Sequence, residues 1–168
     1  MGIFKRALLT GFLVSIWLIG GFTLLSLILI SVPHMILRTL TGVLGLVILF
    51  TGIYYAMRSG RCRAPGYSYL QALKTGVFIS VVTGIMLAIA SALYTYLNPH
   101  FADDMVKEAE TSLRSAGTSA EVISSKLQAV RDEFTIGRQV VQALAVQILF
   151  GTVYSLILSA FMKSNKKR

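Results

Sequence analysis

Four long runs without a single charged residue dominate this sequence of 168 residues. They cover residues 7–31, 39–57, 75–97 and 139–162, and the shortest of them contains 19 residues. An α-helix rises about 1.5 Å per residue, so each run matches a hydrocarbon core of about 30 Å. The sequence therefore predicts an all-α, polytopic membrane protein with four transmembrane helices, organised as one membrane domain over residues 1–168.

The composition excludes several other classes of protein. Charged residues make up 14% of the chain, whereas soluble domains carry about 25%, which argues against a soluble enzyme domain. The single cysteine, Cys62, excludes an intrachain disulfide framework. Transmembrane β-strands alternate polar and apolar residues, and the four runs do not.

The net charge of +9 is distributed in a way that predicts orientation. All seven acidic residues lie within residues 98–138, and ten of the eleven basic residues outside that segment flank the runs in three clusters. These clusters are Lys5 and Arg6; Arg58, Arg61, Arg63 and Lys74; and Lys163, Lys166, Lys167 and Arg168. Basic flanks stay in the cytoplasm, so we expect both termini to be cytoplasmic. The charge then reflects topology and attraction to anionic lipid rather than nucleic-acid binding.

The three arginines of the second basic cluster lie in residues 58–66, where glycine and proline predict a loop. Its main expected role is to orient the chain. As an alternative, Arg58, Arg61 and Arg63 could contact a lipid phosphate or an acidic cytoplasmic partner.

Residues 98–138 are the one segment with the polarity of a soluble protein, and we expect them outside the cytoplasm between spans three and four. Apolar residues recur there with helical spacing on both sides of Gly117. Thr118 and Glu121 match a capping box that would start the second helix. The segment predicts an amphipathic helical hairpin whose apolar stripes need a partner, which could be the sister helix, the membrane surface or another protein. The residues of this candidate partner surface are Phe101, Met105, Leu113, Ile123, Leu127, Val130 and Phe134.

Small and polar residues recur every four positions in spans three and four. Small residues let membrane helices approach closely, so these two spans should pack along the stripes. The alternative is an oligomer or partner interface built from the same residues. The stripes consist of Gly76, Ser80, Gly84, Ala88 and Ala92 in span three, and Ala143, Gln147, Gly151, Ser155 and Ser159 in span four.

The four runs contain no Asp, Glu, Lys, Arg or His, the residues that usually mark transport pathways. Gln142 and Gln147 are their most polar side chains, and we expect these amides to bond between helices. Outside the runs, His34, His100, Asp103 and Asp104 could bind zinc if the helix ends meet, although their spacing does not favour it. The sequence contains no catalytic or nucleotide-binding motif, so we expect no enzymatic activity, cofactor or metal.

Several segments together resemble one protein family. Residues 66–76 carry a glycine, two tyrosines and A-L-K-T-G at the entry to span three, residues 96–101 read Y-L-N-P-H-F at its exit, and residues 113–134 complete the hairpin. In order and hydropathy they are similar to the small four-pass bacterial membrane proteins catalogued as domain of unknown function 4199. The resemblance implies a bacterial inner-membrane protein and carries over no catalytic residue.

Together these features lead to two functional hypotheses. The first is a non-enzymatic accessory or interaction subunit of a membrane complex, with the hairpin as its recognition element and a membrane protein or a second copy as its partner. The alternative is a small oligomeric transporter or channel component.

Overall fold

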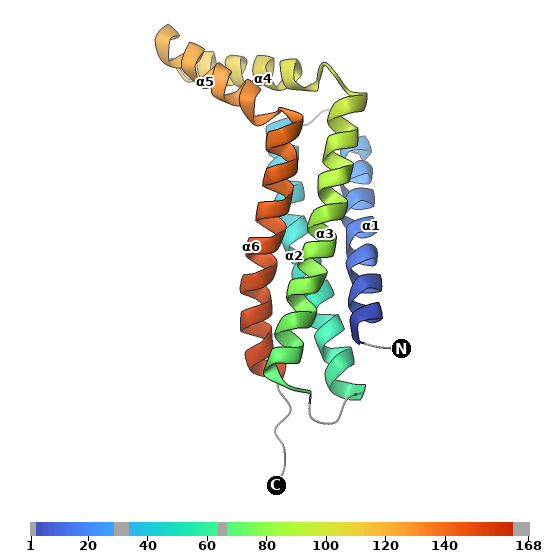
Figure 1. Ribbon diagram of the computed structural model, residues 1–168. Helices are drawn as coiled ribbons and strands as arrows, with labels where there is room; N and C mark the ends of the chain where they lie inside the picture. The colour runs from blue at the N-terminus through green and yellow to red at the C-terminus, as the bar shows by residue number, and fades with distance from the viewer. Residues whose placement is uncertain (1–2, 29–33, 64–66, 163–168) are drawn as a thin grey trace.

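The computed structural model describes residues 3–28, 34–63 and 67–162, which form six α-helices and no strand. The helices are α1 (Ile3–Ile28), α2 (His34–Arg63), α3 (Tyr69–Leu97), α4 (Phe101–Ser115), α5 (Ala120–Glu133) and α6 (Ile136–Met162). Figure 1 shows α1, α2, α3 and α6 as an up-and-down bundle, with α4 and α5 lying across one end. We call this the hairpin end, and the opposite end, where α1 begins and α6 ends, the terminal end.

The bundle helices are long and apolar enough to cross a membrane, with mean hydropathies of 1.9 to 2.3. Large apolar side chains cover their outer surfaces, as Trp17 on α1 (70% exposed) and Phe161 on α6 (74% exposed) illustrate. Exposing such an apolar surface to water is unfavourable, whereas contact with lipid hydrocarbon is not. The predicted all-α, multi-pass membrane protein with four apolar spans is confirmed at this level.

The connection between α2 and α3 differs from the predicted loop over residues 58–66. Helix α2 continues through Arg63 because glycine alone does not end a helix. Gly60 also lets the ring of Tyr67 approach closely, since a Cβ at Gly60 would lie 2.9 Å from that ring. Helix α3 then begins with a capping box in which Ser68 and Gln71 exchange hydrogen bonds.

Helices α3 and α6 form the most extensive contact in the bundle. A Cβ at Gly76 would collide with the side chain of Ser155, and one at Gly151 would collide with Ser80. Farther toward the hairpin end, a Cβ at Gly84 would lie 3.3 Å from the Cβ of Gln147. From one pair to the next, the residue on α3 advances by four positions and the residue on α6 goes back by four. The antiparallel helices therefore keep one register over at least two turns.

Helix α1 joins this pair through a second close approach. A Cβ at Gly11 would lie 2.8 Å from the side chain of Val82, and the Thr83 hydroxyl donates to the Gly11 carbonyl oxygen at 3.4 Å. Buried apolar side chains fill the terminal end of the bundle, among them Leu49, Ile53, Met57, Tyr67, Ile79 and Leu158. The terminal end is therefore tightly packed.

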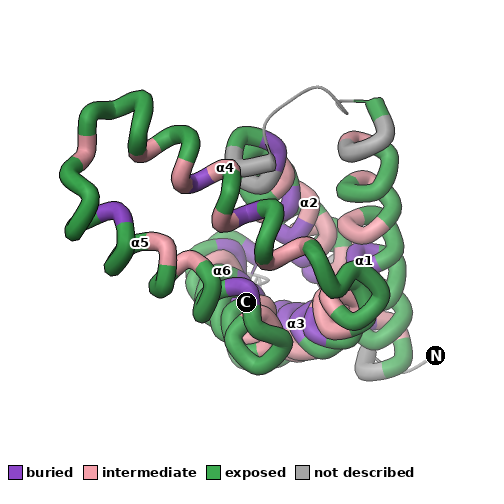
Figure 2. Tube along the Cα trace, turned by 90° about the horizontal axis from the view of Figure 1, so that it is seen from above, coloured by how far each residue is buried: buried purple, intermediate pink, exposed green. Residues whose placement is uncertain are grey.

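Helices α4 and α5 form a hairpin that lies across the bundle end and runs sideways past α6, as Figures 1 and 2 both show. Gly117 joins the two helices with a positive φ of 70°, a conformation that favours glycine. The predicted Thr118–Glu121 capping box is wrong, because α5 starts one residue later with Ser119 at its N-cap and no side-chain cap bond. The two amphipathic helices themselves lie where the sequence predicts them.

Candidate functional site

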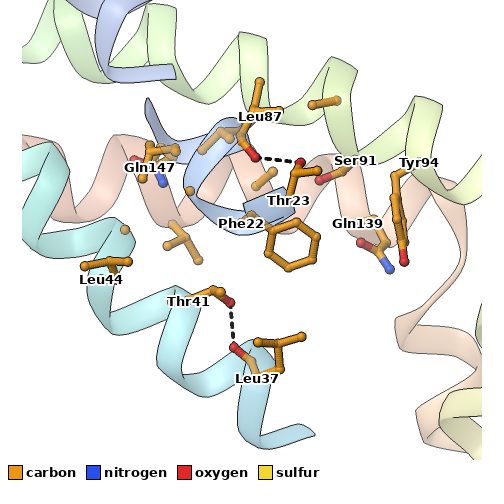
Figure 3. A pocket seen from close by; sticks show the side chains of 18 of the residues that line it. Phe22, Thr23, Leu37, Thr41, Leu44, Leu87, Ser91, Tyr94, Gln139 and Gln147 are labelled. Atoms are coloured by element: carbon orange, nitrogen blue, oxygen red, sulfur yellow. Dashed lines mark hydrogen bonds between the residues drawn. The ribbon is translucent and has the colours of Figure 1, made fainter. Parts of the chain in front are cut away.

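A cavity of about 580 Å³ lies between the four bundle helices at the hairpin end. Its walls come from the end of α1, the start of α2, the end of α3 and the start of α6. Figure 3 shows its side chains converging from all four helices, with Leu44 and Leu87 among the apolar ones. The bundle is thus hollow at the hairpin end and closely packed at the terminal end.

The base of the hairpin forms part of the cavity wall. Phe101 and Met105 of α4 and Phe134, which follows α5, line the cavity. Their positions are fixed by edge-to-face ring contacts: Tyr94 lies 5.1 Å from Phe101, and Phe101 lies 5.3 Å from Phe134, between ring centroids. Phe22 of α1 meets Tyr94 at 6.2 Å. These rings join the hairpin to α1 and α3, so the hairpin base and the cavity form one structural unit.

The polar side chains of the cavity are uncharged within the described part of the chain. Thr23 and Thr41 donate their hydroxyl protons to the carbonyl oxygens of Ile19 and Leu37, at 2.9 and 2.8 Å. Both bonds stay within one helix, and the bond of Thr41 is drawn in Figure 3. A hydroxyl whose proton is used in this way still offers lone pairs, so these groups present acceptors to the cavity.

Gln147 lines the cavity at the contact between α6 and α3. The residue is 8% exposed, and its Oε1 has no hydrogen-bond partner. An unsatisfied buried acceptor costs about 1–3 kcal/mol, and native proteins contain few of them. The predicted bond between helices is therefore not formed by this atom, because the residue opposite is Gly84, which has no side chain to donate.

The small residues predicted to pack lie at the α3–α6 contact inside one chain. Gly76, Ser80, Gly84, Ala88, Gln147, Gly151 and Ser155 are all buried. The hydroxyls of Ser80 and Ser155 donate to the carbonyl oxygens of Gly76 and Gly151 on their own helices. These residues therefore hold two spans of the same chain together and are not available to a second copy.

The apolar stripes of the hairpin face inward. Met105 is 1% exposed, Phe134 4% and Ile123 9%, and the remaining predicted residues (Phe101, Leu113, Leu127 and Val130) are half-buried. Helices α4 and α5 pack against each other, and an exposed ion pair joins Arg131 to Asp103 at 3.1 Å. The candidate partner surface predicted from these residues is thus partly covered within the chain, because α4 and α5 pack against each other.

The remaining candidates are dispersed or lie outside the described part of the chain. Arg58 is exposed and donates to the Tyr54 hydroxyl at 3.3 Å, whereas the side chains of Arg61 and Arg63 are not described. The zinc candidates lack a described set of ligands, since the His34 side chain is not described and no group of three metal-binding side chains occurs among those that are.

The sequence profile of one family, described as protein of unknown function (DUF4199), matches residues 4–164. The matched region contains all four apolar spans and the hairpin, which is nearly the whole chain. No curated protein and no solved structure matches the chain.

Proposed function

We propose that this chain, which belongs to the DUF4199 family, is a non-enzymatic accessory or interaction subunit of a bacterial inner-membrane complex. Both termini would be cytoplasmic and the hairpin extracytoplasmic. The three basic clusters flank the runs in the sequence, and their described members Lys5, Arg6, Arg58 and Lys74 lie toward the terminal end. Together with the confinement of every acidic residue to residues 98–138, they support this orientation.

The observation that carries the proposal is the sideways projection of the hairpin. Helices α4 and α5 leave the bundle at their aromatic base and run past α6 (Figures 1 and 2). A neighbouring membrane protein next to α6 would meet this arm before it met the bundle. Ring contacts hold the base of this arm, formed by α4 and α5, against the bundle: Phe101 packs against Phe134 and against Tyr94 of α3.

The surface of the arm determines what kind of partner it suits. Its exposed residues are mostly polar or charged, including Asp104, Lys107, Glu121 and Lys126. Val122 is the one large apolar residue that is exposed among the described residues of α4 and α5. Such a surface suits recognition through hydrogen bonds and complementary charges in water rather than insertion into lipid. We therefore assign partner binding to the outer face of the hairpin.

The test shortens the arm and leaves its base intact. The Asp103–Arg131 pair shows which residues of the two helices lie opposite each other, and by this register residues 110–124 form the distal part of the hairpin. Replacing them with a short Gly/Ser turn keeps Phe101, Met105 and Phe134. The shortened protein should insert and melt like wild type but lose the partners that copurify from native membranes after crosslinking.

A matched control changes the far side of the bundle. Trp17→Ala removes an exposed ring from α1 and leaves the hairpin untouched. This variant should keep every partner that the wild type captures. Retention of all partners by the shortened protein, or their loss in the Trp17 variant, would place recognition in the spans and overturn the proposal.

The second candidate function is a small oligomeric transporter or channel component. The cavity at the hairpin end favours it, because a transport protein needs space between its helices. At the terminal end, however, Leu49, Ile53 and Met57 are fully buried in the core between the helices. Solute uptake into vesicles that contain the purified protein tests this candidate, which predicts uptake that stops when Ser91→Leu reduces the cavity.

A further inference from the structure

We infer that the cavity at the hairpin end binds an uncharged membrane lipid, which reaches it sideways between α1 and α2. The hydrocarbon chain would lie in the half of the cavity farther from the hairpin, and the polar head group in the half beside the hairpin. Three features support this inference: an opening between two helices, the distribution of polar side chains, and the absence of charge from the described lining.

Helices α1 and α2 pack closely on the side of the cavity nearer the terminal end. A Cβ at Gly52 would collide with the side chain of Val14, and a Cβ at Gly45 would lie 3.3 Å from the side chain of Leu18. Leu18 and Gly45 both line the cavity. The close contact between the two helices therefore reaches as far as the cavity wall.

Beyond this contact, Gly21 and Gly42 leave a gap between the two helices. Antiparallel helices advance in opposite directions, so the position three residues after Leu18 faces the position three residues before Gly45. These positions are Gly21 and Gly42, which both line the cavity, and a Cβ at either would meet nothing within 4 Å. Since neither residue has a side chain to close the wall, the gap gives a hydrocarbon chain of the bilayer a path into the cavity.

Polar side chains are concentrated in the half of the cavity beside the hairpin. Helices α1 and α3 run toward the hairpin and α2 and α6 run away from it, so residue number gives the depth along each helix. The half beside the hairpin contains Thr23, Thr41, Ser91, Tyr94 and Gln139, together with the rings of the hairpin base. The deeper half is lined by Leu18, Leu44, Ile48, Leu87 and Val146, with Gln147 as its polar exception. This order, polar toward the end of the bundle and apolar toward its middle, matches a lipid that keeps the orientation it has in a bilayer leaflet.

The head group would meet Ser91, Tyr94 and Gln139, which Figure 3 shows toward one end of the cavity. Within the part of the chain that the structure describes, these three side chains donate no hydrogen bond. Hydroxyl and amide groups can both donate and accept, so they suit the ester and hydroxyl groups of an uncharged lipid. The Oε1 atom of Gln147 is buried, so we assign the polar contacts to the other three residues.

The size of the cavity and the lack of charge in its described lining favour an uncharged lipid. Small-molecule sites occupy about 300–1,000 Å³, and this cavity of about 580 Å³ falls within that range. Its lining extends along α6 from Gln139 to Gln147, a distance of about 12 Å, which gives a hydrocarbon chain room beside the apolar side chains. A charged head group would lose its hydration without gaining a counter-ion, since no described lining residue is charged.

Two probes with the same oleoyl chain test the class of ligand. Monoolein has an uncharged glycerol head group, whereas oleoyl lysophosphatidylglycerol adds a charged phosphate. Each probe is titrated into the full chain in phosphatidylcholine nanodiscs, and the melting temperature is followed, because a ligand that binds only the folded state raises it with concentration. Monoolein should give the same stabilisation as the charged probe at a concentration at least about tenfold lower.

Matched leucine variants assign the effect to the opening between α1 and α2. Gly21→Leu and Gly42→Leu fill the gap from opposite sides, and each should raise the monoolein concentration needed about tenfold. Gly20→Leu is the control, because a Cβ at Gly20 also meets nothing within 4 Å but this residue does not line the cavity. The control should respond to monoolein like wild type, which also separates binding from any effect of monoolein on the nanodisc.

The comparison of the two probes in wild type requires no variant, so the test stays decisive if a filled variant fails to fold. Equal or stronger stabilisation by the charged probe, or none by monoolein, would overturn the inference. An unchanged response to monoolein in the filled variants that fold, or an equal loss in Gly20→Leu, would also overturn it.

Lipid extraction from the protein purified from native membranes examines the natural ligand. Mass spectrometry should find an uncharged lipid that is retained by wild type and Gly20→Leu and depleted in Gly21→Leu and Gly42→Leu. Charged phospholipid alone, in equal amounts in all four proteins, would contradict the inference.

Discussion

Replacing Gly151 with alanine should loosen the contact between α3 and α6. The added Cβ would overlap both the Oγ and the Cβ of Ser80. Rotation of the Ser80 hydroxyl could move Oγ, at the cost of its 2.9 Å bond to the Gly76 carbonyl oxygen. Rotation cannot move the Ser80 Cβ, which is attached to the backbone, so the helices themselves must separate.

The expected magnitude follows from two opposing terms. Overpacking of a closely packed core costs about 1–3 kcal/mol. Alanine is a better helix former than glycine by about 1 kcal/mol, which hides part of this cost. Gly20→Ala on α1 isolates the collision, because it makes the same backbone change where a Cβ meets nothing within 4 Å. The difference between the two variants should therefore be about 1–3 kcal/mol.

The assay is thermal unfolding of each purified variant in the same detergent. For a chain of this size about 1 kcal/mol shifts the melting temperature by about 2–4 °C, so Gly151→Ala should melt several degrees below Gly20→Ala. Gly84→Ala should fall between them, since its Cβ would lie 3.3 Å from Gln147 and needs only a small adjustment.

A second substitution should reverse the effect of the first. Ser80→Gly removes both overlapping atoms and leaves the Ser80 Cα 3.5 Å from the new Cβ of Gly151→Ala, an ordinary contact. The double variant should therefore recover part of the lost stability, with a coupling free energy of about 0.5–3 kcal/mol. Equal melting of Gly151→Ala and Gly20→Ala, or simple additivity in the double variant, would refute the register described for these helices.

Three further predictions concern the ends of the bundle. A reporter fused after residue 168 should report a cytoplasmic location, and one inserted at Gly117 should report the opposite side; the reverse pattern would contradict the orientation. Burial raises the pKa of the Tyr67 hydroxyl above its usual value of 10.0, although its bond to Thr75 opposes the shift. The stability from protonated Tyr67 is present below pH 10.0 and is lost above it, so wild type should lose melting temperature more steeply than Tyr67→Phe in alkaline buffer. Asp103→Asn should change stability by less than about 1 kcal/mol, because the Asp103–Arg131 pair is exposed; a larger loss on unfolding in detergent would contradict this expectation.

The sequence predicted the features that depend on one helix at a time. Uncharged length identified four spans, and helical spacing identified the two amphipathic helices of the hairpin. Helix ends were harder, because the transmembrane runs mark only the apolar part of each helix. The Ser68–Gln71 spacing was a usable signal for the start of α3, whereas Thr118–Glu121 has the same pattern and does not cap α5.

Features that depend on several helices escaped sequence reasoning. The sequence allowed the two stripes of the hairpin to pack on each other, but the burial of Met105 and Phe134 also depends on where the hairpin lies on the bundle end. The cavity requires the relative positions of four helices, none of which carries a motif for it. The signal that could have drawn attention to it was the polarity of Gln147, which lies in an apolar span opposite a glycine.

The register of α3 and α6 also accounts for the contrast between the two ends of the bundle. At the terminal end it pairs small residues with small residues, such as Gly76 with Ser155 and Gly151 with Ser80. One step farther it places the long side chain of Gln147 against Gly84, and Gln147 lines the cavity. Pairs of small residues let the two helices approach closely. The longer side chain of Gln147 occupies the space beside Gly84, and its Oε1 lacks a hydrogen-bond partner. The same repeat that closes the terminal end therefore also places the side chain of Gln147 in the cavity wall at the hairpin end.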